Sequence, residues 1–137
     1  MEVRRMSGMI KVLLVPPQEK PRLVTVEHTL ENLQGLVGGY LQALYPFNDP
    51  VAIVADEEGM INQKPANRVL RAADGKAYDF LKGTFFICGL GEEDFTSLSN
   101  ELAEKYMEMY REPEYFLRVK GGHVMMLKGD APPEMII

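Results

Sequence analysis

The stretch GTFFICGL, residues 83–90, decides the fold. Its apolar run is rich in aromatic and β-branched residues, carries no charge, and is bounded by Gly83 and Gly91. A short apolar run between turn residues is typical of a strand that is buried on both faces. We therefore place this stretch at the centre of a sheet, where Cys88 is expected to be an inert core residue.

Other stretches are predicted to join this strand. IKVLLV (10–15) ends at two prolines, and RLVTVE (22–27) alternates between apolar and polar residues. Such alternation is typical of a strand with one covered face. VAIVA (51–55) leads into the turn DEEG, and MI (60–61) is expected to return from it as a hairpin partner.

Two helices are expected beside the sheet. Thr29 is a suitable N-cap, and apolar residues then recur every three or four positions until Pro46, which predicts a helix of about fifteen residues. Gly35, Gly38 and Gly39 lie within it. They serve either close packing and bending or a ligand that lies against bare backbone.

The second helix is expected over residues 100–111, with Ser97 or Ser99 as its cap and Pro113 after it. Residues 62–79 show no clear period and are expected to form an irregular loop with a turn at 73–75. The fold class is thus α+β: a mixed or antiparallel sheet of about five strands, with two main helices packed on one face. We divide the chain into an N-terminal extension (1–8), a single α+β domain (9–117) and a C-terminal arm or tail (118–137).

Composition narrows the functional classes. The chain has 137 residues, a formal net charge of −5, one cysteine and two histidines. This excludes an internal disulfide and a multi-cysteine or three-histidine metal centre. The acidic balance argues against direct nucleic-acid binding, and no apolar run reaches the roughly 18–20 residues that span a bilayer. We expect a cytoplasmic protein without a membrane partner.

Catalytic candidates are few. Cys88 lies in the predicted core strand, His28 precedes a helix cap, and His123 lies in the tail. No catalytic residue, metal ligand or cofactor is assigned. A competing hypothesis is a metal-dependent enzyme that uses acidic turn residues such as Asp56, Glu57 or Glu92.

Two groups of residues are candidates for binding. Amide and cationic side chains in the irregular segment suit a phosphate or a nucleobase edge, and these are Asn62, Lys64, Asn67, Arg68 and Arg71. The chain from Glu92 to Glu114 holds eight acidic and two basic residues. Its helix therefore offers a surface for a basic partner, with the candidates Glu101, Glu104, Glu108, Tyr115 and Phe116.

Four segments carry a family resemblance. They are Gly38-Gly39-Tyr40, Asp56-Glu57-Glu58-Gly59, Pro65-Ala66-Asn67-Arg68 and Gly83-Thr84-Phe85. Together they resemble the uncharacterised family named domain of unknown function 3846, over roughly residues 9–116. Asp56 stands where that family usually has asparagine. The resemblance implies an origin in Gram-positive bacteria, their phages or mobile elements, and it implies no reaction.

The leading hypothesis is a small non-enzymatic binding protein of a phage or mobile element. In it, the chain counters a host defence by inhibiting a host protein through an acidic and aromatic surface. The alternative is a protein that sequesters a nucleotide-type small molecule at the cationic segment, where a homo-oligomer could complete the site. Both rest partly on the genomic setting that the resemblance implies.

Overall fold

The computed structural model describes residues 8–59, 63–118, 120–122 and 124–129. Its elements, in chain order, are β1 (Met9–Val15), β2 (Arg22–Glu27), α2 (Leu30–Val37), β3 (Leu41–Leu44), β4 (Val51–Asp56), β5 (Ala66–Arg71), β6 (Ala77–Lys82), β7 (Phe85–Leu90), β8 (Phe95–Thr96), α3 (Asn100–Met109), β9 (Glu114–Arg118) and β10 (Val124–Lys128). Within this part of the chain, no helix is long and apolar enough to cross a bilayer.

The main sheet is antiparallel and has six strands, in the order β2-β1-β7-β4-β3 with β8 beside β7. β7 lies between β1 and β4, and residues 85–89 are all buried. The predicted central strand and the α+β class with an antiparallel sheet are confirmed. Because β7 is apolar at every position, both faces of the sheet need a cover.

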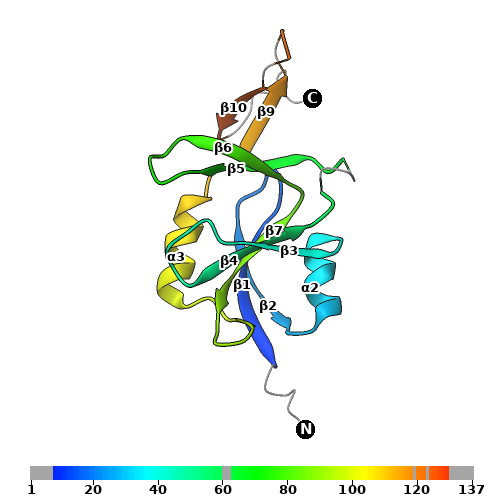
Figure 1. Cartoon of the computed structure of the whole chain (residues 1–137), viewed down its shortest axis with the longest axis vertical. Helices are drawn as coiled ribbons and strands as arrows, with labels where there is room; N and C mark the ends of the chain where they lie inside the picture. Colours follow the sequence, from blue (N-terminus) through cyan, green and yellow to red (C-terminus); the bar gives the residue numbers. More distant parts are fainter. Residues whose placement is uncertain (1–7, 60–62, 119, 123, 130–137) are drawn as a thin grey trace.

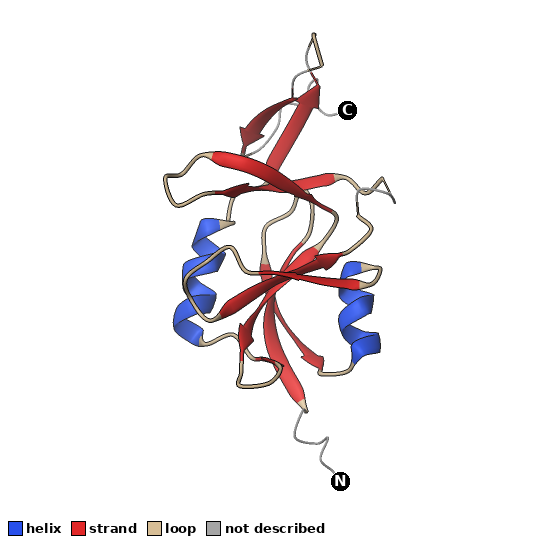
Figure 2. Cartoon of the chain, viewed as in Figure 1, coloured by secondary structure: helices blue, strands red, loops and turns tan. Residues whose placement is uncertain are grey.

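The two helices supply that cover from opposite faces (Figures 1 and 2). Leu33 and Val37 of α2 belong to the cluster that contains Phe86, whereas Tyr106 of α3 belongs to the cluster that contains Phe85. Successive strand residues point to opposite faces, so these are two separate cores. The prediction that both helices pack on one face is therefore wrong. An apolar stripe indicates that a helix packs on the sheet, but it does not indicate on which face of the sheet the helix packs.

The first helix is shorter than predicted. Thr29 is its N-cap, as expected, and its hydroxyl accepts a hydrogen bond from the Asn32 backbone N–H at 3.1 Å. The helix ends at Val37 because Gly38 takes a left-handed conformation with φ of 75°. Leu41–Leu44 instead forms β3, which pairs with β4. The apolar residues after the glycines thus belong to a strand, although their spacing also fits a helix.

Residues 62–79 were predicted to be irregular, and this prediction is wrong for most of the segment. β5 and β6 form a hairpin that crosses the end of the main sheet (Figure 1). Its turn is the predicted one, since Gly75 has φ of 86° and its N–H donates to the Ala72 carbonyl oxygen. The alternation of apolar and polar residues that is typical of a strand is not visible here, because Asn67 and Arg68 are polar but buried. Both side chains form internal hydrogen bonds.

The C-terminal part begins with α3, whose N-cap is Ser99. β9 and β10 then form a second hairpin, which contacts β5 and extends away from the sheet (Figure 1). The expected strand at 60–61 and most of the N-terminal extension lie outside the described residues, and the domain boundaries stay a prediction.

Candidate functional site

The four segments that carry the family resemblance meet at one junction of the fold. The Glu57 N–H donates to the Tyr40 carbonyl oxygen, and the Gly83 N–H donates to the Pro65 carbonyl oxygen. These bonds join the end of α2 to the turn after β4, and the start of β5 to the turn before β7. The junction is therefore the structural centre of the resemblance.

Lys64 ties this junction together. Its Nζ donates to the Val37 carbonyl oxygen at 2.7 Å and to the Gly38 carbonyl oxygen at 3.1 Å. The same Nζ forms an ion pair of 2.7 Å with Asp56, whose carboxylate is buried. A cation at a helix C-terminus satisfies carbonyl groups that lack helical partners and complements the helix dipole. Lys64 thus caps α2, and its charge is used within the fold.

The glycines of this region allow a close approach. A Cβ at Gly39 would overlap the Asp56 carboxylate, and a Cβ at Gly83 would come within 2.7 Å of the Lys64 side chain. Gly35, by contrast, has open space around it. Of the two explanations for the helix glycines, the structure supports packing at Gly39, because a larger residue would push apart the Asp56–Lys64 pair.

Asn67 and Arg68 lie beneath the junction and are fully buried. The Asn67 amide donates to the carbonyl oxygens of Val15 and Gly83, at 2.8 and 2.9 Å. The Arg68 guanidinium donates to the Asn67 amide oxygen and to the Tyr110 carbonyl oxygen, both at 2.9 Å. These two side chains therefore connect β5 to β1, to the turn before β7 and to the end of α3.

The burial of Arg68 has an electrostatic cost. It lowers the pKa of the guanidinium, and the charge of nearby Glu114 opposes this shift. Glu114 is also buried and accepts a hydrogen bond from the Val69 N–H at 2.8 Å. Arg68 Nε has no partner within the described part of the chain. Arg68 is therefore a structural cation, and its charge is compensated by backbone carbonyl groups and by the Glu114 carboxylate.

The cations of the predicted anion site differ in how far the fold uses them. The cations of that set are committed to different partners: Lys64 to the end of α2, Arg68 to the interior, and Arg71 to the Gly75 carbonyl oxygen at 2.8 Å. Arg71 is the exposed one of the three. Asn62 lies outside the described residues.

A groove borders the junction, and we call it the Tyr45–Tyr78 groove. It has a volume of about 450 Å³ and lies between the β3–β4 side of the sheet and β6. Tyr45 and Tyr78 line it together with the carboxylates of Asp56, Glu57 and Asp79. Its apolar lining is formed by Leu44, Ala55, Leu70, Phe80 and Leu81.

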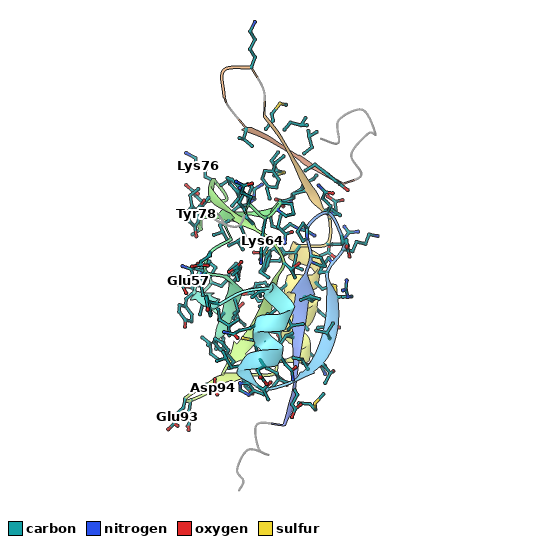
Figure 3. All side chains as sticks on the ribbon, turned by 90° about the vertical axis from the view of Figure 1, so that its right-hand side faces the viewer. Glu57, Lys64, Lys76, Tyr78, Glu93 and Asp94 are labelled. Carbon is teal, nitrogen blue, oxygen red and sulfur yellow. The ribbon has the colours of Figure 1, made fainter. Side chains whose placement is uncertain are left out.

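The polar groups of this groove differ in how far the fold uses them. Tyr45 and Tyr78 are 62% and 61% exposed, and no described residue pairs with the Glu57 carboxylate. Figure 3 shows Tyr78 and Glu57 projecting on the same side of the molecule, from β6 and from the turn after β4. Asp56, in contrast, is held by Lys64. The groove therefore presents two exposed tyrosine rings and a carboxylate, that of Glu57, with no described partner, and all three are accessible to a ligand.

Sequence reasoning missed this groove. Asp56 and Glu57 were candidates there for metal ligands and parts of a predicted turn, and Tyr78 and Asp79 fell in a segment predicted to be irregular. The groove forms because the β5–β6 hairpin folds over the end of the sheet, and no local pattern reports that contact.

The predicted partner surface is spread over α3 and β9. Glu101, Glu104 and Glu108 are exposed on α3, and Glu108 lies 3.3 Å from Arg111 in an ion pair. Tyr115 and Phe116 are half-buried on β9, and the Phe116 ring packs on Phe80 with 5.4 Å between ring centres. The carboxylates are thus available to solvent, whereas the Phe116 ring helps to hold the two hairpins together.

The candidates for chemistry lie apart from the groove. Cys88 is fully buried, and burial raises the pKa of its thiol to about 12. His28 Nε2 lies 3.5 Å from the Asp94 carboxylate, and Figure 3 shows Asp94 at the opposite end of the molecule from Tyr78 of the β5–β6 hairpin. His123 lies outside the described residues, and the described ones contain no group of three acidic, histidine or cysteine residues placed to hold a metal ion.

Comparison with known proteins yields one match. The family model described as Domain of unknown function (DUF3846) matches residues 10–111. No curated protein and no solved structure matches the chain.

Proposed function

The chain belongs to the DUF3846 family, and we propose that it is a non-enzymatic binding protein that holds an arginine-bearing segment of a partner protein in the Tyr45–Tyr78 groove. One observation carries the proposal: two largely exposed tyrosine rings line the same groove as the Glu57 carboxylate, which has no partner among the described residues. We thereby propose that the acidic and aromatic surface that binds the partner is this groove, and not the surface of α3 and β9 that was expected from the sequence.

The chemistry of the groove favours a guanidinium group. A planar guanidinium stacks on a tyrosine face and bonds a carboxylate with two parallel hydrogen bonds. Glu57 and Asp79 supply carboxylates beside Tyr45 and Tyr78, and Lys82 is the single cation among the described lining residues. The net charge of −5 would further speed the approach of a basic partner.

The biological setting is the further part of this proposal. The resemblance to proteins of phages and mobile elements supports an anti-defence role in which the bound segment belongs to a host protein in the bacterial cytoplasm. A protein inhibitor of that kind would bury about 800 Å² on each partner, so the groove would serve as the anchor of a larger contact. The metal-dependent enzyme remains an alternative without a supporting observation.

A peptide titration tests the proposal. The probe is a fluorescein-labelled octapeptide of alternating arginine and glycine, followed by fluorescence anisotropy against the full chain, with a lysine–glycine peptide of the same charge as comparison. We expect saturable binding that is tighter for the arginine peptide. Glu57→Gln and Tyr78→Ala should each weaken it about tenfold, the effect of losing one charged or aromatic contact.

The matched control removes the same charge elsewhere. Glu104→Gln changes an exposed carboxylate of α3 and should leave peptide affinity unchanged. Equal affinity for both peptides, or an effect of Glu104→Gln as large as that of Glu57→Gln, would indicate attraction by net charge alone and refute the groove as the binding site.

A further inference from the structure

A second groove lies on the other side of Pro46 from the Tyr45–Tyr78 groove, and we call it the α3 groove. It has a volume of about 490 Å³, within the range of about 300–1,000 Å³ that is typical of small-molecule sites. It is bounded by loop 46–49, by β5 and its following turn, by the second half of α3 and by the end of β10. Four parts of the chain that are distant in sequence thus build one concave surface.

One wall of the α3 groove is aromatic, and its charges are already satisfied. The Asp49 carboxylate accepts hydrogen bonds from Lys105 Nζ at 2.7 Å and from the Tyr106 hydroxyl at 2.6 Å, and these bonds lower its pKa. The Phe47 and Tyr106 rings pack with their centres 4.7 Å apart. Tyr106 is fully buried behind this wall, so the surface that faces the groove is that of the half-buried Phe47 and the exposed Met109, and the charges of Asp49 and Lys105 are paired with each other.

The opposite end of the groove is cationic. Arg71 and Lys128 are exposed there, and the Arg71 guanidinium uses only Nη1 within the described part of the chain, for the Gly75 carbonyl oxygen. No described residue pairs with Lys128 Nζ. The one carboxylate at this end, Glu114, is buried, is bonded to the Val69 N–H and lies near the Arg68 charge.

We propose that the α3 groove binds a small aromatic molecule that carries a phosphate group, of the nucleoside monophosphate kind. The phosphate is held by the free donors of Arg71 and by Lys128, because a guanidinium fork and an ammonium are suited to phosphate oxygens. The ring system lies on Phe47 and Met109, and the buried Tyr106 ring supports Phe47 from behind. This site is distinct from the Tyr45–Tyr78 groove and does not depend on the proposed function.

Calorimetric titration of the full chain tests the site. The probes are AMP and GMP, with adenosine, ribose 5-phosphate and inorganic phosphate as the separate halves of the ligand. We expect at least one monophosphate to bind saturably and each half to bind about tenfold more weakly or not at all, since either half forfeits one end of the groove. A nucleoside that binds as tightly as its monophosphate would overturn the assignment of the cationic end.

Two variants and one control complete the test. Arg71→Gln and Lys128→Gln should each weaken binding of the monophosphate about tenfold. Lys128→Gln breaks no described contact, so it tests the site even if Arg71→Gln loosens the β5–β6 turn. Arg22→Gln removes an exposed cation on β2 and should change nothing. Absence of binding at millimolar monophosphate, or equal effects of Arg22→Gln and Lys128→Gln, would overturn the proposal, whereas Glu57→Gln, which tests the other groove, should leave this binding intact.

Discussion

Replacement of Arg68 by methionine separates a structural from a ligand-binding role for the residue that sequence analysis placed in an anion site. Arg68 is fully buried and donates to the Asn67 amide oxygen and to the carbonyl oxygens of Glu19 and Tyr110, at 2.8–2.9 Å. Methionine has a similar unbranched stem but no donor. The variant therefore leaves three acceptors without their donor and removes the Arg68 charge that lies near the buried Glu114 carboxylate.

The magnitude follows from these contacts. Each hydrogen bond from a charged group contributes about 1.5–3 kcal/mol, but the variant also relieves the desolvation of a guanidinium whose Nε has no described partner. Removal of one partner from a buried charge network costs about 3–5 kcal/mol on balance. We expect this loss for Arg68→Met. Since small domains have about 5–15 kcal/mol of total stability, the loss would be a large fraction of it.

The assay is urea unfolding at pH 7, followed by circular dichroism. The control is Arg22→Met, whose guanidinium forms an exposed pair of 3.4 Å with Glu19 and should contribute less than about 1 kcal/mol. Arg68→Lys keeps the charge but not the three-way fork, and should lie between the native chain and Arg68→Met. A loss below about 1 kcal/mol for Arg68→Met would refute the structural role and return Arg68 to the candidates for ligand binding.

Three further predictions concern the junction at Gly39, the Asp49 loop that bonds to α3, and the thiol of Cys88 in the core. Gly39→Ala should destabilise the chain in urea by about 1–3 kcal/mol, because its Cβ would overlap the Asp56 carboxylate, whereas Gly35→Ala, in open helix surface, should stabilise it by about 0.5–1 kcal/mol; equal effects would contradict the packing argument. Asp49 has a lowered pKa in the folded chain, so its bonds stabilise the fold at pH values above the ordinary carboxyl pKa of about 3.9 and this contribution disappears as the pH falls through the folded value. The difference in melting temperature between the native chain and Asp49→Asn should therefore be present at pH 7 and shrink below about pH 4, and a difference that grows on acidification would show the opposite sign. Cys88, with a thiol pKa raised to about 12 by burial, should not react with Ellman's reagent at pH 8 until the chain is unfolded, and rapid labelling of the folded chain would refute its place in the core.

Local patterns were sufficient for much of the fold. The apolar run at 83–90 predicted the central strand, and Thr29 and Ser99 act as the expected helix caps. These features depend on neighbours in the chain, since a cap bonds to an N–H three residues away and a strand shows its burial in its own composition. The candidate grooves had no such signal, because each is built from segments that meet only through the β5–β6 hairpin.

The sequence by itself determined the class of the protein: an acidic α+β domain with one core thiol, a strand buried on both faces and two capped helices. Only the tertiary structure decided which face each helix covers, that Leu41–Leu44 pairs with β4, and which charges remain free for a partner. The physical reason is that Lys64, Arg68 and Arg71 are all cations in one polar segment, and nothing in their sequence neighbourhood indicates which of them will be paired within the fold. Their difference arises from carbonyl and carboxyl groups that lie far away along the chain and reach the cation only in the folded state.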